Sequence, residues 1–178
     1  TPKPMNFYAE SKLQAEQHII SNHDLYCIVR TNLFGWNYQN KLSISEWFLR
    51  ELRANKQITG FNDVFFTPIL TMTLSDIVEQ IISNKLKGIY HAGSPTSISK
   101  YDFGIQLAKL FYLNEKLIKP ISVEDVKLSA KRSKNMSLDS TKLHRSLPGL
   151  SYTLQSDLQL FKKLEDTGWV NKFKSSLL

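Results

Sequence analysis

A tyrosine and a lysine four residues apart near the amino terminus are the residues of this chain best suited to chemistry. Tyr8 and Lys12 lie in the sequence Asn-Phe-Tyr-Ala-Glu-Ser-Lys-Leu of residues 6–13. In a helix, this spacing puts both side chains on one face, with about 5–6 Å between their Cβ atoms. An isolated tyrosine, with a pKa of about 10, exchanges protons poorly near neutral pH. A fixed ammonium beside the phenol favours the phenolate, so the pair could exchange a proton with a substrate oxygen at physiological pH.

The same spacing also has a purely structural interpretation. Tyr-x-x-x-Lys is a short pattern, and an ordinary amphipathic helix with a lysine reaching to solvent produces it. The flanking residues favour the chemical interpretation, because they extend the pattern to Pro-x-Asn-x-Tyr-x-x-Ser-Lys-Leu-x-x-Glu through Pro4, Asn6, Ser11, Leu13 and Glu16. This longer string resembles the active-site helix of the extended short-chain dehydrogenase/reductases, which act on nucleotide sugars.

Composition places the chain among globular proteins. It has 178 residues, a net charge of +7 and a pI near 9.4, with 42% hydrophobic and 22% charged residues. The excess of basic residues suits anionic partners such as pyrophosphates. The sequence contains no recognisable nucleic-acid-binding module. No apolar run reaches the roughly 20 residues of a membrane span. We therefore expect neither nucleic acid nor membrane as a partner.

The single cysteine and the histidines indicate the compartment and the lack of a metal site. Cys27 lies in an apolar run, so we expect a small buried residue without a disulfide, as in a reducing, cytoplasmic environment. The four histidines show no metal-ligand spacing, either with one another or with Cys27. We predict no metal site.

Helical patterns alternate with apolar strand-like runs, which predicts an α/β fold. Residues 25–30 are nearly all apolar and indicate a buried, parallel strand. Residues 31–35 follow at its carboxyl end, where ligands lie in open α/β sheets. A second strand is expected at residues 88–93, and short extended pieces at 58–68 and 118–123. The expected helices cover residues 6–22 and 152–164 and begin at Ser43, Ser75, Ser99, Ser122 and Lys142.

Later segments resemble the same family in the same order. They are residues 30–35, 67–69, 74–77, 88–91, 99–103 and 130–139. Together they look most like the dTDP-4-dehydrorhamnose reductase branch, with the order of the segments carrying the resemblance. It implies the carboxyl-terminal part of a Rossmann-type NAD(P)-binding fold plus a small mixed α/β substrate domain. Residues 1–35 and 72–93 would belong to the first part, and residues 36–71 and 94–178 to the second.

The Gly-rich turn that holds a dinucleotide pyrophosphate is absent from this sequence. No two of its seven glycines lie three residues apart, whereas such turns place glycines at that spacing at a helix amino terminus. Two strands also do not form a stable open sheet. We therefore expect this chain to be the carboxyl-terminal half of a longer protein, with the cofactor half elsewhere.

The resemblance implies a mechanism. NADPH or NADH would deliver hydride to a keto carbon of the sugar, Tyr8 would donate the proton, and Lys12 would tune Tyr8 and hydrogen-bond the nicotinamide ribose. Tyr8 and Lys12 would thus be catalytic and cofactor-binding at once.

Four residues are candidates for binding the nucleotide-sugar substrate: Asn32, Phe34, Thr67 and Arg132. Arg132, always charged, suits bidentate contact with a diphosphate, although a surface ion pair is an equal alternative. Asn32 could instead stabilise a turn, and Phe34 could instead pack in the core.

Other functions remain open. A nucleotide-sugar epimerase or dehydratase of the same family would share these features, because its additional acid/base residues would lie outside this sequence. A non-catalytic binding or regulatory subunit could keep the fold, although it would need neither Tyr8 nor Lys12. A homodimer, or assembly with a separate amino-terminal half, is possible in each case.

Overall fold

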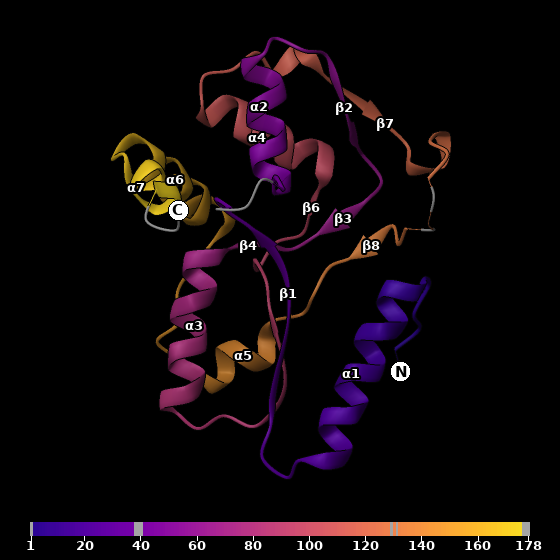
Figure 1. Ribbon diagram of the computed structural model, residues 1–178, viewed down its shortest axis with the longest axis vertical. Helices are drawn as coiled ribbons and strands as arrows, with labels where there is room; N and C mark the ends of the chain where they lie inside the picture. The colour runs from indigo at the N-terminus through magenta and orange to yellow at the C-terminus, as the bar shows by residue number, and fades with distance from the viewer. Residues whose placement is uncertain (1, 38–40, 129, 131, 176–178) are drawn as a thin grey trace.

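The computed structural model describes residues 2–37, 41–128, 130 and 132–175, which form an α/β fold (Figure 1). Its helices are α1 (Phe7–Asn22), α2 (Ile44–Arg53), α3 (Thr71–Ser83), α4 (Lys100–Leu110), α5 (Thr141–Ser146), α6 (Leu154–Asp166) and α7 (Trp169–Ser175), with 3₁₀ turns η1 (Glu115–Leu117) and η2 (Val123–Asp125). Its strands are β1 (Cys27–Phe34), β2 (Ile58–Phe61), β3 (Phe65–Phe66), β4 (Pro68–Leu70), β5 (Gly88–Ala92), β6 (Ile98–Ser99), β7 (Ile118–Ile121) and β8 (Asn135–Met136).

Strand β1 is the centre of a three-stranded parallel sheet of order β4-β1-β5. Its residues 27–31 pair with β5, and its residues 32–34 pair with β4. The predicted parallel strand and the α/β class are therefore confirmed.

The prediction that this strand and Cys27 are buried is wrong. Cys27 is exposed, and Phe34 is the only β1 residue that is fully buried. A parallel strand is buried when other elements cover both its edges and faces. Among the described residues, the segment 27–31 has a strand partner on one side only.

Helices lie on both faces of this sheet. On one face, Ile77 and Ile81 of α3 and Leu143 of α5 pack with Tyr90 of β5 in a buried cluster that also includes Ile69. Helix α1 lies on the opposite side of β1 from α3 and α5 (Figure 1). It has no buried residue, so this side of the sheet is only loosely covered.

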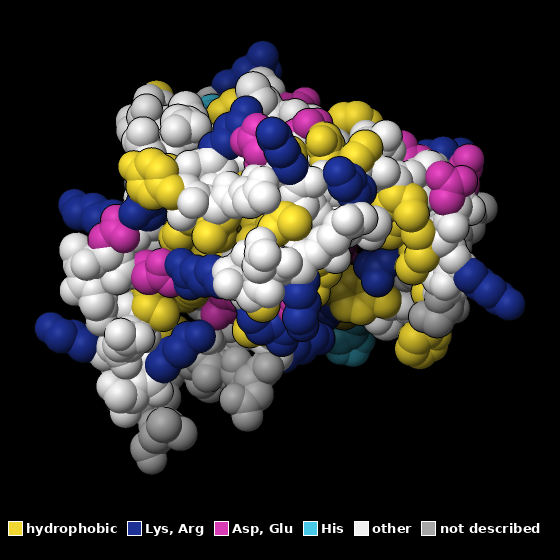
Figure 2. Space-filling view, turned by 90° about the horizontal axis from the view of Figure 1, so that it is seen from above, with side chains coloured by type: hydrophobic (Ala, Val, Ile, Leu, Met, Phe, Trp, Pro, Cys, Tyr) yellow, Lys and Arg dark blue, Asp and Glu magenta, His cyan; other side chains and the backbone are white. Residues whose placement is uncertain are grey.

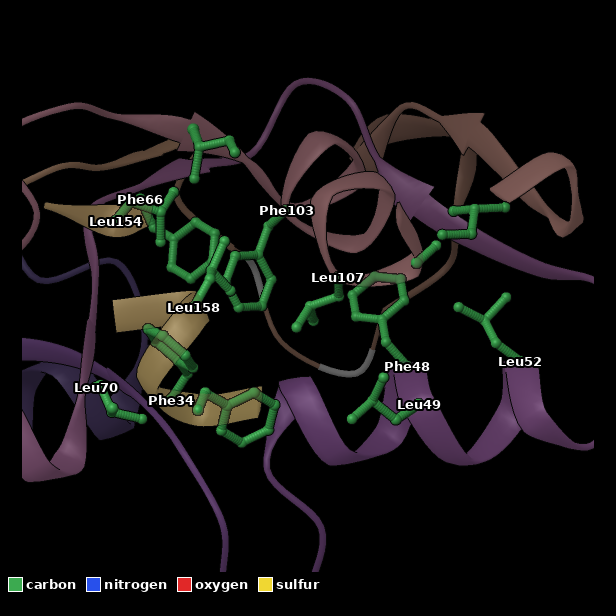
Figure 3. Packing of buried hydrophobic residues seen from close by; sticks show 14 of the residues in the cluster. Phe34, Phe48, Leu49, Leu52, Phe66, Leu70, Phe103, Leu107, Leu154 and Leu158 are labelled. Atoms are coloured by element: carbon green, nitrogen blue, oxygen red, sulfur yellow. The ribbon is translucent and has the colours of Figure 1, made fainter. Parts of the chain in front are cut away.

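The second core lies where the smaller sheets, β2-β7 and β6-β3-β8, meet α2, α4 and α6. Its buried phenylalanines come from β1, α2, β3, α4 and α6, and Figure 3 shows Phe34, Phe48, Phe66 and Phe103 among them. The ring centroid of Phe34 lies 5.3 Å from that of Phe103 and 5.7 Å from that of Phe161, both edge-on, a favourable geometry for aromatic pairs. This core holds the carboxyl end of β1 rigidly.

The cluster beside the central sheet contains residues from both of the parts into which the sequence divides the chain. Leu143, Leu147 and Tyr152, which the sequence assigns to the substrate part, pack against Ile77 and Tyr90 beside the central sheet. The exact boundaries of the two parts stay a prediction.

Two predicted helix starts are confirmed by their caps. Ser43 and Glu46 form a reciprocal capping box at α2, and the Asp102 amide of α4 donates to the Ser99 hydroxyl over 3.0 Å. The final helix is followed by α7, which the sequence did not predict.

The predicted start of the third helix at Ser75 is wrong, because α3 begins at Thr71. Its first turn is capped from α6, where the buried Asp157 carboxylate accepts the Leu70 amide at 2.8 Å and the Thr73 hydroxyl at 2.6 Å. Burial raises the pKa of Asp157, and these two hydrogen bonds oppose that rise. A cap supplied from 87 residues away leaves no local sequence signal.

On the face seen in Figure 2, Lys and Arg side chains lie among acidic, hydrophobic and other residues, and several of them gather at the lower centre of the view. In the part of the chain that the structure describes, no helix has both the length and the apolar character needed to cross a bilayer.

The contact between α4 and α2 predicts how the substitution of Gly104 by alanine changes the stability of the fold. A Cβ on Gly104 would lie 2.5 Å from Cε1 of Phe48, which is itself buried. Overpacking of this kind costs about 1–3 kcal/mol, which exceeds the gain of about 1 kcal/mol from alanine in a helix. We expect Gly104→Ala to lower the free energy of unfolding by about 1 kcal/mol, measured by urea denaturation.

The matched control is Gly149→Ala. A Cβ there meets no atom within 4 Å, so its free energy of unfolding should stay unchanged or rise slightly. Equal destabilisation by both substitutions would contradict the packing argument.

Candidate active site

Helix α1 presents Tyr8 and Lys12 together. Asn6 caps it, since its side-chain oxygen accepts the Ala9 amide at 2.9 Å, and this places Tyr8 in the first turn. The Lys12 ammonium nitrogen lies 5.6 Å from the centroid of the Tyr8 ring, within cation–π range. Tyr8 is 70% exposed, so its hydroxyl is open to a ligand and to water.

The pair lies on an open groove of about 590 Å³ between α1, the segment before it and β1. Its volume is in the range of small-molecule sites. It is lined by Pro2, Lys3, Pro4, Tyr8, Ala9, Lys12, Leu13, Glu16, Val29, Arg30 and Thr31. We call it the tyrosine groove.

An ion pair holds the two walls of the tyrosine groove together. Arg30 of β1 donates from Nε and Nη2 to the two carboxylate oxygens of Glu16 on α1, the first over 2.8 Å. This hydrogen bond, more than the Coulomb attraction of Glu16, raises the pKa of Arg30. Because α1 buries no residue, the bidentate pair is its principal polar anchor to the sheet.

The groove wall also contains an unpaired hydroxyl. Thr31 Oγ1 is buried and has no hydrogen-bond partner among the described residues. A buried polar atom without a partner costs free energy, and this one belongs to a residue that lines the tyrosine groove.

A second groove, of about 620 Å³, carries Arg132. We call it the arginine groove; it is lined by Met5, Val123, Glu124, Val126, Leu128, Ala130, Arg132 and Lys134. Pro4 lines the tyrosine groove and Met5 the arginine groove. The two grooves therefore flank the short segment that leads into α1.

Asn32 and Thr67 are brought together, but by structural hydrogen bonds. The Asn32 amide donates to the Met136 carbonyl at 2.9 Å and to Thr67 Oγ1 at 3.4 Å. Thr67 Oγ1 also accepts the Leu138 amide at 3.1 Å, and Thr67 is buried. These bonds tie β1 and the start of β4 to β8, and direct contact of either side chain with a substrate stays a prediction.

Phe34 belongs to the core. It is 1% exposed and packs between Phe103 and Phe161. The structure gives it a packing role, and its contact with a sugar also stays a prediction.

With this geometry in place, comparison with known proteins identifies the family. The family described as the RmlD substrate binding domain matches residues 1–164. This chain belongs to that family. The match spans both grooves and the elements that build them.

Relatives of this RmlD-family chain carry two different names. Methionine adenosyltransferase 2 subunit beta of Xenopus tropicalis is 23% identical over 81% of the chain and 45% of the relative. A dTDP-4-dehydrorhamnose reductase of Aggregatibacter actinomycetemcomitans is 28% identical over 80% of the chain and 52% of the relative. The chain thus spans about half the length of the relatives it matches.

Solved structures show the same fold. A dTDP-4-dehydrorhamnose reductase from Clostridium acetobutylicum aligns with a TM-score of 0.85 and 23% identity, over 93% of this chain and 58% of that one. A Bacillus anthracis dTDP-4-dehydrorhamnose reductase in complex with NADP aligns with a TM-score of 0.80 and 24% identity, over 90% and 56%. These matches confirm the predicted Rossmann-type α/β fold.

Sequence reasoning missed several residues of this site. The Glu16–Arg30 pair joins positions 14 residues apart, and only the pairing of α1 with β1 reveals it. The sequence motif includes Glu16 but predicts no role for it. The unpaired hydroxyl of Thr31 had no signal in the sequence.

The donor groups available to a cofactor or metal are limited. Within the described residues no cluster of three His, Cys, Asp or Glu side chains could hold a metal ion. The Lys12 ammonium has no acidic partner among these residues, so it is available to the hydroxyl groups of a ribose. No Gly-rich turn is present for the pyrophosphate, so the residues here fit only the nicotinamide-ribose end of a dinucleotide.

The anchoring role of Glu16 can be tested by hydrogen exchange. In Glu16→Gln the charge-assisted pair with Arg30 is lost, and a half-exposed pair contributes about 1 kcal/mol or less. We expect the amides of α1 to exchange up to about fivefold faster while those of β5 are unchanged.

Glu10→Gln is the control, because it makes the same charge change on the same helix at an exposed residue without an ion pair among the described residues. Glu10 lies in the first turn, where its charge favours the helix amino terminus, so the two variants are compared over the amides of the later turns. Equal acceleration in both variants would show that Glu16 does not anchor the helix.

Proposed function

We propose that this chain is the catalytic-helix and substrate-binding half of an NAD(P)H-dependent reductase of 4-keto nucleotide sugars. The observation that carries the proposal is the Tyr8–Lys12 pair, side by side on α1 and open to the tyrosine groove. The reductase relatives and the fold shared with an NADP complex support it. A cytoplasmic location is part of this proposal.

A bound nicotinamide cofactor would supply the hydride that reduces the keto carbon. Tyr8 donates its hydroxyl proton to the oxygen of that carbon, so that the alkoxide charge never develops fully. Lys12 stabilises the phenolate that remains and hydrogen-bonds a ribose hydroxyl. Because Tyr8 is 70% exposed, water can return the proton, and the balance is one hydride and one proton gained by the ketone.

The arginine groove is where the substrate's diphosphate would lie. Arg132 lines it, and guanidinium groups bind phosphate oxygens in a bidentate manner. The arginine groove and the tyrosine groove are separated by residues 4–5. A ligand could therefore place its sugar near Tyr8 and its diphosphate near Arg132.

A further polypeptide would complete the site. Three observations support this part of the proposal: α1 buries no residue, Phe7 is 86% exposed, and residues 27–31 of β1 have a strand partner on one side only in the described part of the chain. A dinucleotide-binding half, on the same chain or a separate one, would cover α1, pair with β1 and supply the Gly-rich turn.

A binding or regulatory subunit is the second candidate. The methionine adenosyltransferase 2 subunit beta relatives favour it, since that name denotes one subunit of an enzyme. Tyr8 and Lys12 weigh against it, because a structural role requires neither an exposed phenol nor its neighbouring ammonium. An epimerase or dehydratase of the same family would use the same pair and differ in the reaction product.

Substitution of Tyr8 tests the reductase proposal. In the full-length protein, or in this chain assembled with its cofactor-binding half, Tyr8→Phe removes the proton donor. We expect kcat for reduction of a 4-keto sugar nucleotide to fall by about 10²-fold or more, measured by NADPH oxidation, with nucleotide binding retained.

Tyr112→Phe is the control, because Tyr112 is 89% exposed and follows α4, away from both grooves. It should leave kcat unchanged. Full activity of Tyr8→Phe would sink the catalytic assignment and favour the binding subunit.

The chain by itself gives a second test. Because it lacks a Gly-rich turn, we expect no specific dinucleotide binding in a fluorescence titration, apart from weak attraction of the NADPH phosphates to Arg132. Saturation at low-micromolar NADPH would contradict the view that the pyrophosphate is held elsewhere.

A further inference from the structure

Lys100 lies across the β6-β3-β8 sheet from the segment that carries Arg132. It follows β6 directly, and its amide donates to the Val64 carbonyl at 3.0 Å. On the other side of β3, the Phe65 amide donates to the Lys134 carbonyl at 2.8 Å. The register Ser99–Phe65–Asn135 therefore brings Lys100 and residues 132–134 to the same end of the sheet.

The Lys100 ammonium is held there without an acidic partner. Its nitrogen lies 5.6 Å from the centroid of the Phe66 ring, and the side chain is half-buried. The nearest acidic residue in sequence, Asp102, instead accepts the Ser99 hydroxyl at 2.6 Å. Among the described residues no carboxylate forms an ion pair with Lys100.

Arg132 is the cation that acts on Lys100. Burial first, and then the positive charge of Arg132, lower the pKa of Lys100. Arg132 is exposed and likewise has no ion-pair partner among the described residues. Two like charges at one end of a sheet repel each other, and an anion bound between them relieves that repulsion.

The carboxylates near this end of the sheet are already engaged by a third cation. Lys134 pairs with Asp63 at 3.3 Å and with Glu124 at 2.7 Å. Asp63 also accepts the Ser122 hydroxyl at 2.7 Å and the Val123 amide at 2.9 Å. Both carboxylates thus pair with Lys134, and among the described residues neither forms an ion pair with Lys100 or Arg132, which are left to a ligand.

We propose that Lys100 and Arg132 together bind one phosphate-type dianion at the end of the β6-β3-β8 sheet. Lys100 begins α4, so the positive end of that helix adds to the attraction. Resting on the proposed function, this anion is the diphosphate of the sugar nucleotide, and Lys100 is a substrate-binding residue beside Arg132.

Titration of this chain with inorganic pyrophosphate, followed by calorimetry at low salt, tests the proposal. We expect Lys100→Gln and Arg132→Gln each to weaken pyrophosphate binding about tenfold or more. Lys119→Gln, which makes the same charge change at an exposed residue of β7, should change the affinity less than about twofold. Equal weakening by all three variants would show a general charge effect and overturn the site.

A second measurement follows the ammonium itself. In an NMR titration, Arg132→Gln should raise the pKa of Lys100, because it removes the nearby positive charge, and so should saturation with pyrophosphate. A Lys100 resonance that responds to neither would also overturn the proposal.

The reductase activity can fail separately from the anion site. If pyrophosphate binding depends on Lys100 and Arg132 but no 4-keto sugar nucleotide is reduced by the assembled protein, the anion site stands and the proposed reaction falls. If reduction occurs with an unchanged KM in Lys100→Gln, the reaction stands and the role of Lys100 falls.

Discussion

Strand β1 is the constraint on which the rest of the structure depends. Its alternate residues point to one face, and each ties a different part of the molecule to the sheet. Arg30 holds α1 through Glu16, Asn32 holds β8 through the Met136 carbonyl, and Phe34 enters the aromatic core. A shift of one residue in the register of β1 would turn all three to the opposite face. The pairing of β1 with β5 and β4 therefore bears on the tyrosine groove, the attachment of β8 and the aromatic core at once.

The carboxyl end of β1 is better supported than its middle, where α1 lies against it. At its carboxyl end, Phe34 packs between Phe103 and Phe161, and the elements around it are close-packed. In the middle of the strand, α1 is held to Arg30 by one partly exposed ion pair, and Thr31 Oγ1 lacks a partner among the described residues. Catalytic groups work best when they are held within a fraction of an ångström. Tyr8 and Lys12 lie on the less supported side, so an additional covering element would improve their positioning as well as exclude water.

Sequence reasoning succeeded where the determinants are local. The Tyr8–Lys12 spacing predicted a shared helix face, and the Ser43 and Ser99 patterns predicted caps that the structure confirms. It failed where residues distant in the sequence determine a helix boundary or the burial of a side chain. The start of α3 depends on Asp157 of α6, and the exposure of Cys27 depends on which strands flank β1. In the sequence, Lys100 is only one residue of the Ser99–Asp102 capping pattern. Its position at the same end of the sheet as Arg132 follows from the pairing of β3 with both β6 and β8.

The placement of charges explains why a basic protein can still recognise one anion. The cations on the face of Figure 2 lie at the surface, and exposed charges are screened within about 8 Å at physiological ionic strength. Net charge alone therefore confers little selectivity. Discrimination requires cations that are partly buried and not neutralised, which is the situation of Lys100 beside Phe66, while Lys134 is neutralised by Asp63 and Glu124. The protein thus separates two tasks: Lys134 stabilises the loop that bears Arg132, and Lys100 and Arg132 are left to attract the ligand toward the groove adjoining Tyr8.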